Sequence, residues 1–263
     1  MWVFTRPDPS IGGEGGRVPP SAPVIFILMK IDFEIRKRLI ISADDFGKSE
    51  LANKNIRRLA EAGKLDRISV MSNGNFKPGE IEKIKKTGIK LDIHLDLAEI
   101  PEKEKNLRQG VLKRGIFFLL KHLSSREYTK KRIIARWSEQ IEKFQELFSR
   151  LPDGLNSHQH VHLFKRYLMI TVDLAHQYKI SYFRFAKKGL LGSKTNVRRV
   201  VHFLWKNDKK FLGINHFDRP DYFVSLDWIK DFDNFLANLP KGKIELACHP
   251  ERQEEMDLID KYF

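Results

Sequence analysis

From Arg38 onward, short apolar runs alternate with longer segments of helical periodicity, and this alternation constrains the fold more than any other feature of the chain. The apolar runs indicate strands at residues 39–42, 67–71, 91–94, 154–158, 182–185, 222–225 and 244–248. Helical periodicity is clearest at residues 51–62, 81–87, 131–148, 167–178, 197–205 and 228–239. Repeated strand–helix units of this kind build a mainly parallel sheet. The 263 residues are enough for one α/β barrel domain.

Residues 1–30 differ in composition from the rest of the chain. They contain the Pro- and Gly-rich stretches RPDPS, GGEGG and PPSAP, which are typical of a linker. The apolar stretch at 24–29 is too short for a secretory signal and has no basic segment before it. We therefore expect a disordered extension at residues 1–30 and a single domain at residues 31–263. No apolar run approaches the ~20 residues that a transmembrane helix needs.

The formal net charge of +14 would suit an anionic partner such as nucleic acid, an acidic glycan or a membrane surface. The basic residues are scattered through amphipathic segments such as 130–136 and 198–210, however, without the aromatic-interleaved motif of a nucleic-acid-binding module. We favour a solvated surface and no specific nucleic-acid site, because spread charge gives only non-specific attraction. Cys248 is the single cysteine, so nothing indicates an oxidising compartment, and we expect a cytoplasmic protein.

Polar and ionisable residues occur at or just after the carboxyl ends of the predicted strands. In barrels and open parallel sheets this edge binds ligands, because the loops between strands and helices converge there. The residues in these positions are Asp44, Asp45, Asn73, His94, His158, Arg184 and His249. This placement predicts one site built from several strands.

Asp44 and Asp45 are adjacent carboxylates followed by Gly47, which permits a tight turn after the strand. Neighbouring residues on an extended chain face different directions, so one carboxylate can bind a cation while the other addresses a water beside it. The alternative is a capping role for the helix that begins near Ser49, which would need only one aspartate. We favour the functional interpretation.

Three histidines alternate at His158, His160 and His162, and in an extended strand their side chains would lie on one face. His94 is flanked by apolar residues and, taken alone, is typical of a buried core histidine. With Asp45 and one histidine of the run it completes an Asp/His/His set, which suits zinc or another divalent ion. His158 lies nearest the strand end and is the preferred ligand, while His160 and His162 would contact ligands or substrate, or be loop residues.

Arg184 lies between aromatic residues in a predicted buried strand, where an unpaired guanidinium would be costly. It needs an anion nearby, and an active-site aspartate and a structural salt bridge elsewhere both remain open. His249 follows the last predicted strand and is a candidate proton donor, with a capping or loop role as the alternative.

At these residues the chain resembles the YdjC-like family of carbohydrate deacetylases, which includes the ChbG and HpnK proteins. The resemblance covers roughly residues 38–251. It rests on the segments SADDFG (42–47), SVMSNG (69–74), HLDL (94–97), NSHQHVH (156–162) and CHP (248–250), together with Arg184.

This resemblance implies an irregular (β/α) barrel related to that of the polysaccharide deacetylases. It also implies metal-dependent removal of an N-acetyl group from an amino sugar, with Asp45, His94 and His158 as metal ligands and Asp44 as the base. Family members usually continue through another helix and strand after the CHP motif, whereas this chain stops at Phe263. We therefore expect a barrel that is incomplete, or closed differently, at its C-terminal end.

The expected reaction uses a divalent ion, Mg²⁺ or Zn²⁺, to lower the pKa of a water and polarise the acetamide carbonyl. Asp44 would take the proton, Arg184 would orient Asp44, and His249 would protonate the amine that leaves. The expected substrate is an N-acetylated amino-sugar oligosaccharide or glycolipid. The oligomeric state stays open, a homodimer included.

Two other functions remain open at this point. One is metal-dependent phosphoester hydrolysis, which also uses Asp/His sets but calls for more metal ligands in a two-metal site. The other is a non-catalytic carbohydrate- or nucleic-acid-binding protein that retains the fold.

Overall fold

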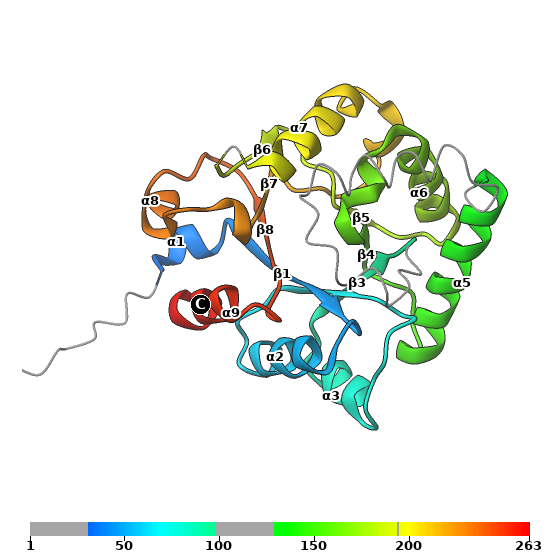
Figure 1. The fold of residues 1–263 in the computed structure, drawn as a ribbon, viewed down its shortest axis with the longest axis horizontal. Coiled ribbons are helices and arrows are strands. Elements are labelled where there is room, and N and C mark those ends of the chain that lie inside the picture. The colour runs from blue at the N-terminus through cyan, green and yellow to red at the C-terminus, as the bar shows by residue number, and fades with distance from the viewer. Residues whose placement is uncertain (1–30, 98–128, 194) are drawn as a thin grey trace, which may run out of the picture.

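An eight-stranded sheet organises the chain in a computed structural model that describes residues 31–97, 129–193 and 195–263 (Figure 1). The strand order is β5-β4-β3-β2-β1-β8-β7-β6, and every strand pairing within these ranges is parallel. The sheet curls into an incomplete α/β barrel, which confirms the predicted architecture. The extension predicted at residues 1–30 lies outside the described residues.

All seven predicted strands are present, and the structure adds a short one. The strands are β1 (Leu39–Phe46), β2 (Arg67–Val70), β3 (Lys90–Leu95), β4 (Gly154–Ser157), β5 (Tyr182–Phe183), β6 (Gly189–Leu190), β7 (Tyr222–Ser225) and β8 (Ile244–Cys248). The additional strand, β6, is only two residues long and carries no periodic signal.

The helices surround the sheet (Figure 1). They are α1 (Phe33–Arg36), α2 (Glu50–Glu61), α3 (Glu80–Lys86), α5 (Lys130–Phe148), α6 (Lys165–Gln177), α7 (Asn196–Asp208), α8 (Phe232–Ala237) and α9 (Gln253–Tyr262). Within the described ranges, three 3-10 turns accompany them, η3 (His158–Leu163), η4 (Leu212–Ile214) and η5 (Leu226–Trp228). The six predicted helices all occur. The structure adds α1 and α9, whose apolar positions are few.

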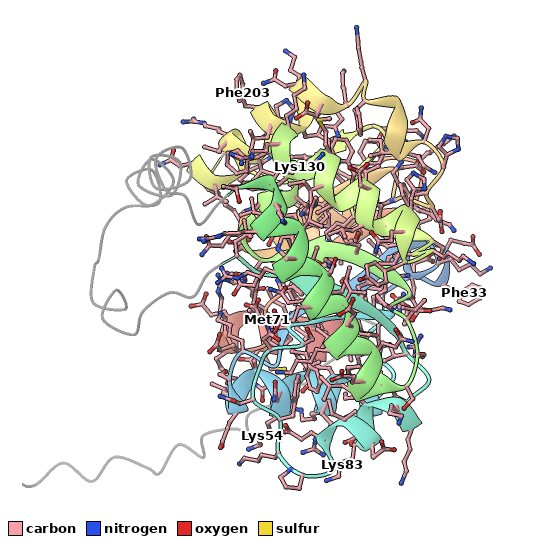
Figure 2. All side chains as sticks on the ribbon, turned by 90° about the vertical axis from the view of Figure 1, so that its right-hand side faces the viewer. Phe33, Lys54, Met71, Lys83, Lys130 and Phe203 are labelled. Carbon is pink, nitrogen blue, oxygen red and sulfur yellow. The ribbon has the colours of Figure 1, made fainter. Side chains whose placement is uncertain are left out.

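Each long helix buries one stripe against the sheet. In α5, Trp137 and Ile141 lie one turn apart and are fully buried, as the spacing of an amphipathic helix requires. The buried apolar residues from Leu39 to Tyr262 form a single core cluster. Side chains that project away from this core include Phe33 and Phe203, which are 68% and 62% exposed (Figure 2). A single domain over residues 31–263 remains a prediction.

The two ends of the sheet approach each other through the segment that leads into β7. The backbone N–H of Phe183 donates to the carbonyl of Asp218 at 2.9 Å, and the N–H of Asp218 donates to the carbonyl of Ser181 at 2.9 Å. These bonds form one isolated parallel bridge between Tyr182 and Asp218. The curled sheet is thus tied across its gap by a loop instead of by a full strand.

The expectation of an extended histidine run is wrong. β4 ends at Ser157, and Gln159 and His160 then adopt left-handed backbone conformations with φ of 53° and 55°. The hydroxyl of Ser157 accepts a hydrogen bond from the backbone N–H of His162 at 2.9 Å and so closes the turn. The three histidines therefore do not lie on one face of a strand.

Among the described residues, no helix combines the length and the apolarity that crossing a membrane would require.

Candidate active site

Asp45, His94 and His158, the three predicted ligands, lie together at the carboxyl ends of their strands. The Oδ1 atom of Asp45 is 3.3 Å from Nε2 of His94 and 3.0 Å from Nδ1 of His158. One ligand atom from each residue lies within 4.8 Å of the other two. These residues, hereafter the Asp45 group, come from β1, β3 and the start of η3. A carboxylate and two imidazoles at this spacing fit a divalent ion.

A backbone irregularity in β1 sends Asp44 and Asp45 to different sides. The pairing of β1 with β2 shifts register between Ala43 and Phe46, and Asp45 has a φ of 72°. Bulges next to active sites re-aim side chains in this way, and Asp tolerates the left-handed region better than most residues. The sequence indicated a strand that ends at residue 42, whereas β1 continues to Phe46.

His94 is oriented by a neighbour on β4. Its Nδ1 atom forms a hydrogen bond with Oδ1 of Asn156, and Nδ2 of Asn156 donates to the hydroxyl of Ser69 at 2.9 Å. Because an amide oxygen only accepts, Nδ1 of His94 carries a proton, so in the neutral ring Nε2, which faces Asp45, is the lone-pair nitrogen that can bind an ion. Metal-binding histidines are typically held this way.

Arg184, directly after β5, forms an ion pair with Asp44. Of the two alternatives that the sequence left open for this arginine, it therefore pairs with the aspartate of the candidate site. Nη1 and Nη2 of Arg184 donate to the two oxygens of Asp44 at 2.7 and 2.8 Å, and both side chains are 2% exposed. Burial by itself would raise the pKa of Asp44. The adjacent guanidinium outweighs this effect and holds that pKa well below its usual range.

Arg184 also serves a second buried carboxylate. Its Nε donates to Oε1 of Glu245 at 2.6 Å, and the hydroxyl of Tyr182 donates to Oε2 of Glu245 at 2.7 Å. The Arg67 guanidinium stacks 3.9 Å above the Tyr182 ring, and its Nε donates to Asp92 at 2.8 Å. The interior of the barrel therefore holds a column of paired charges, defined here as the buried column, beneath Asp44.

His249 is held by a carboxylate from the last helix. Oε2 of Glu255 accepts from the His249 backbone N–H at 2.7 Å and lies 3.3 Å from its Nδ1. Burial lowers the pKa of His249, but the Glu255 hydrogen bond and the charges of Asp44 and Asp45 raise it above its ordinary value. This environment favours the protonated ring that a general acid needs.

His160 and His162 occupy different, less polar surroundings. The His160 ring contacts the rings of Phe223 and Trp228 edge-on, with centroids 5.4 and 5.9 Å apart. His162 pairs with Ser157 and with the backbone carbonyl of Arg184, 2.9 Å from its Nε2. Burial lowers the pKa of each histidine to about 3, so both rings are neutral.

Asn73, the remaining strand-end candidate, is exposed after β2. Several residues that contact the site were not anticipated as functional, among them Lys48, Asn156, Glu245 and Glu255. Asn156 is the first residue of the NSHQHVH segment. Glu245 is a charged residue inside an apolar strand, and the same kind of signal identified Arg184 as a candidate. Glu255 lies on a helix that the periodicity did not reveal.

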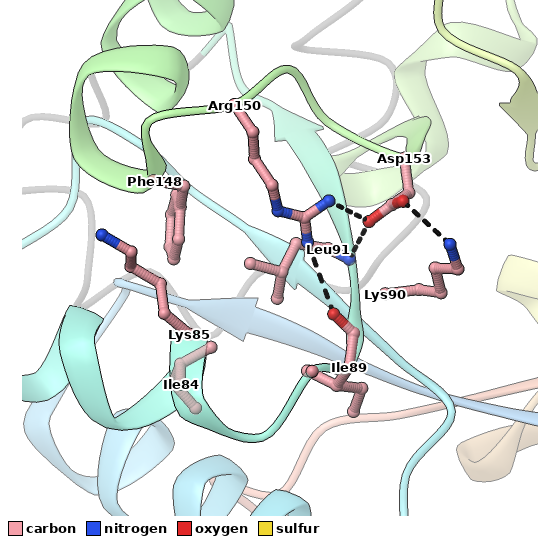
Figure 3. Close-up of a pocket in the computed structure, with 9 residues that line it drawn as sticks. Ile84, Lys85, Ile89, Lys90, Leu91, Phe148, Arg150 and Asp153 are labelled. Atoms are coloured by element: carbon pink, nitrogen blue, oxygen red, sulfur yellow. Dashed lines mark hydrogen bonds and ion pairs between the residues drawn. The ribbon is translucent and has the colours of Figure 1, made fainter.

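A cavity of about 350 Å³ lies away from this site (Figure 3). It is lined by residues at the start of β3, such as Lys90 and Leu91, and therefore opens at the opposite edge of the sheet. Nη1 of Arg150 donates to Asp153 at 2.7 Å, and Nζ of Lys90 lies 3.2 Å from the same carboxylate (Figure 3). Its rim charges thus largely satisfy one another.

Comparisons of the sequence with known proteins identify one protein family and relatives that share one name. The profile of the YdjC-like protein family matches residues 38–261. A carbohydrate deacetylase of Halalkalibacterium halodurans is 28% identical over 229 residues, which are 83% of this chain and 87% of that protein. A carbohydrate deacetylase of Mus musculus is 23% identical over 165 residues, which are 60% of this chain and 53% of that protein. The chain thus matches about half the length of the mouse relative.

A crystal structure from Enterococcus faecalis, of a protein named for cellobiose-phosphate cleavage, shares the fold. Its TM-score is 0.53 at 18% sequence identity, and the match covers 80% of each chain. At this identity the likeness speaks for the architecture alone.

Proposed function

The chain belongs to the YdjC-like family, and from this premise we propose that it is a metal-dependent carbohydrate deacetylase that removes an N-acetyl group from an amino sugar. Relatives that share the match are named carbohydrate deacetylases. The observation that carries the proposal is the convergence of the Asp45 group beside a second, clamped carboxylate, Asp44. Hydrolysis of an amide needs a polarised carbonyl and a base for water, and this pair of features supplies a place for each.

The Asp45 group would hold the divalent ion. Its donors are one carboxylate and two imidazoles, which suit Zn²⁺ and are compatible with Mg²⁺. When bound, the ion would polarise the acetamide carbonyl and make a nearby water more acidic. In the described ranges, this is the one group of three or more metal-ligating side chains, whereas two-metal phosphoester hydrolysis would need further ligands beside it.

The remaining steps belong to the side chains of this chain. Asp44 accepts the proton of the attacking water, and Arg184 fixes the plane of its carboxylate. His249 donates a proton to the amine as it leaves, and Glu255 keeps its Nδ1 side occupied. General acid–base transfer of this kind contributes roughly 10²- to 10⁴-fold to a rate.

The substrate that we propose is an N-acetylated amino sugar in a short oligosaccharide or a glycolipid. We further propose that residues 31–263 act as one catalytic domain in the cytoplasm, without a specific nucleic-acid partner. A homodimer is compatible with the proposal and is not required by it.

The proposal is tested by incubating the protein, with Zn²⁺ or Mg²⁺, with short N-acetylglucosamine oligomers and following the loss of one acetyl group by mass spectrometry. Asp45→Asn and His158→Ala should abolish the reaction. Asn retains the left-handed backbone at position 45, so the first variant removes a charge without straining the fold. The matched exposed controls Asp257→Asn and His216→Ala should react like the wild type. Full activity in metal-stripped Asp45→Asn would refute the proposal.

A further inference from the structure

The two oxygens of Asp45 have different partners. Oδ1 faces both imidazoles of the Asp45 group, at 3.3 Å from His94 and 3.0 Å from His158. Oδ2 lies 2.9 Å from Nζ of Lys48. The carboxylate of Asp45 is 2% exposed. One oxygen points toward the place for an ion and the other toward an ammonium group.

Lys48 is itself held in place from the loop after β8, the strand that pairs with β1. Its Nζ lies 2.9 Å from Oε2 of Glu251, in the loop after β8, and Oε1 of Glu251 accepts from the hydroxyl of Ser49 at 2.9 Å. That loop is anchored in turn by Asn55, whose Nδ2 donates to the carbonyl of Pro250 at 2.7 Å. A long lysine side chain that is tied at both carboxylates loses much of its freedom to leave Asp45.

We propose that Lys48 is a positioning residue that reserves Oδ2 of Asp45 and so restricts this ligand to one-oxygen binding of the divalent ion. The inference rests on the proposed function. A carboxylate that binds through both oxygens occupies two coordination positions, whereas one that binds through a single oxygen leaves a position open. Hydrolytic metal sites need such open positions for water and substrate.

Removing Lys48 would have two effects of the same sign on metal affinity. The second oxygen would become available to the ion, and a positive charge beside the site would disappear. By this inference, Lys48 lowers the affinity of the site for its ion and keeps one coordination position open for water or substrate. We expect Lys48→Met to bind Zn²⁺ roughly tenfold more tightly, which corresponds to ~1.4 kcal/mol.

Lys48→Met is the test, because methionine keeps much of the length of the stem and removes the charge. Lys54→Met is its matched control, since Lys54 lies exposed on α2, at the surface of the molecule (Figure 2). Zn²⁺ affinity is measured by calorimetry on metal-stripped protein, and the visible absorption of bound Co²⁺ reports the coordination number. Glu251→Gln, which frees Lys48 from its anchor, should give a smaller change in the same direction.

The expected result is tighter Zn²⁺ binding, a higher Co²⁺ coordination number and a lower kcat in Lys48→Met, with Lys54→Met like the wild type. Unchanged or weaker Zn²⁺ binding, or a Co²⁺ spectrum identical to that of the wild type, would overturn the inference. A wild-type protein that binds Co²⁺ but deacetylates no oligomer would refute the proposed function, while the spectra would still decide the role of Lys48. A wild type that binds neither ion would overturn both.

Discussion

Replacing Arg184 with methionine tests whether the buried column is held together by this one guanidinium. Arg184 is 2% exposed and donates to Asp44 at 2.7 and 2.8 Å and to Glu245 at 2.6 Å. Methionine fills a similar volume but leaves both carboxylates without their cation. Removing one partner of a buried ion pair costs about 3–5 kcal/mol. Stabilities of folded domains are roughly 5–15 kcal/mol, so the variant should fold but unfold at clearly lower urea concentration.

The loss should depend on pH, and its sign follows from the pKa values. In the wild type the pKa of Asp44 is lowered, so its contribution to stability is present above its ordinary pKa and is lost only in acid. Burial already raises the pKa of Glu245 in the wild type. Without Arg184, burial is expected to raise the pKa of Asp44 above its unfolded value and that of Glu245 further. The native variant would then bind protons that the unfolded chain does not, and its stability should rise as the pH falls from 8 to 5.

Urea unfolding, followed by circular dichroism in the presence of a chelator at pH 8 and pH 5, measures both effects. The difference in unfolding free energy between wild type and Arg184→Met should be largest at pH 8. Adding Asp44→Asn or Glu245→Gln to the variant removes one unpaired charge and should restore part of the loss at pH 8. A loss below about 1 kcal/mol, or one equal at both pH values, would refute the reasoning.

Three further predictions concern the site. Asn156→Leu should weaken Zn²⁺ binding about 10- to 100-fold, because His94 loses the acceptor for its Nδ1 proton, and unchanged affinity in calorimetry would contradict this. Asp44→Asn should retain the ion but reduce kcat by about 10²- to 10⁴-fold, whereas loss of the ion would exchange the roles of the two aspartates. Glu255→Gln should lower the pKa of His249, so the alkaline limb of the kcat–pH profile should move to lower pH while KM stays constant; an unmoved limb would exclude this role for Glu255.

The strands and long helices could be predicted because their burial patterns repeat. The two-residue β6 and the four-residue α1 could not, because so few residues define no period. The helix α9 has buried positions at Met256 and Ile259, yet charged and polar residues outnumber its apolar ones. Tertiary packing, which the local pattern does not contain, establishes these elements.

The site was predictable where chemistry depends on strand ends and unpredictable where it depends on turns. Asp45, His94 and His158 lie together because parallel strands deliver their carboxyl ends to one edge. The alternation of histidines after β4 predicted an extended chain, but the Ser157 hydroxyl bonds to the His162 backbone and closes a turn. A side chain that competes for backbone hydrogen bonds in this way overrides a period-two pattern.

Partners contributed from distant segments were the least accessible to sequence reasoning. Lys48 follows β1 and Glu251 follows β8, so the two residues are far apart in the sequence. Because β1 and β8 pair in the sheet, the two side chains nevertheless form an ion pair. Nothing in either local segment specifies that contact.

The position of β1 between β2 and β8 has a consequence for how such a protein can change over evolution. Two successive carboxylates on this strand have different partners. Asp45 faces the imidazoles from β3 and η3, and Asp44 pairs with the arginine that follows β5. A deletion or insertion of a single residue here would exchange the two assignments at once, whereas a change at Arg184, after β5, or at His249, after β8, would leave Asp45, His94 and His158 in place. Descendants that abandon turnover are therefore expected to keep this strand intact and to diverge first around β5 and β8.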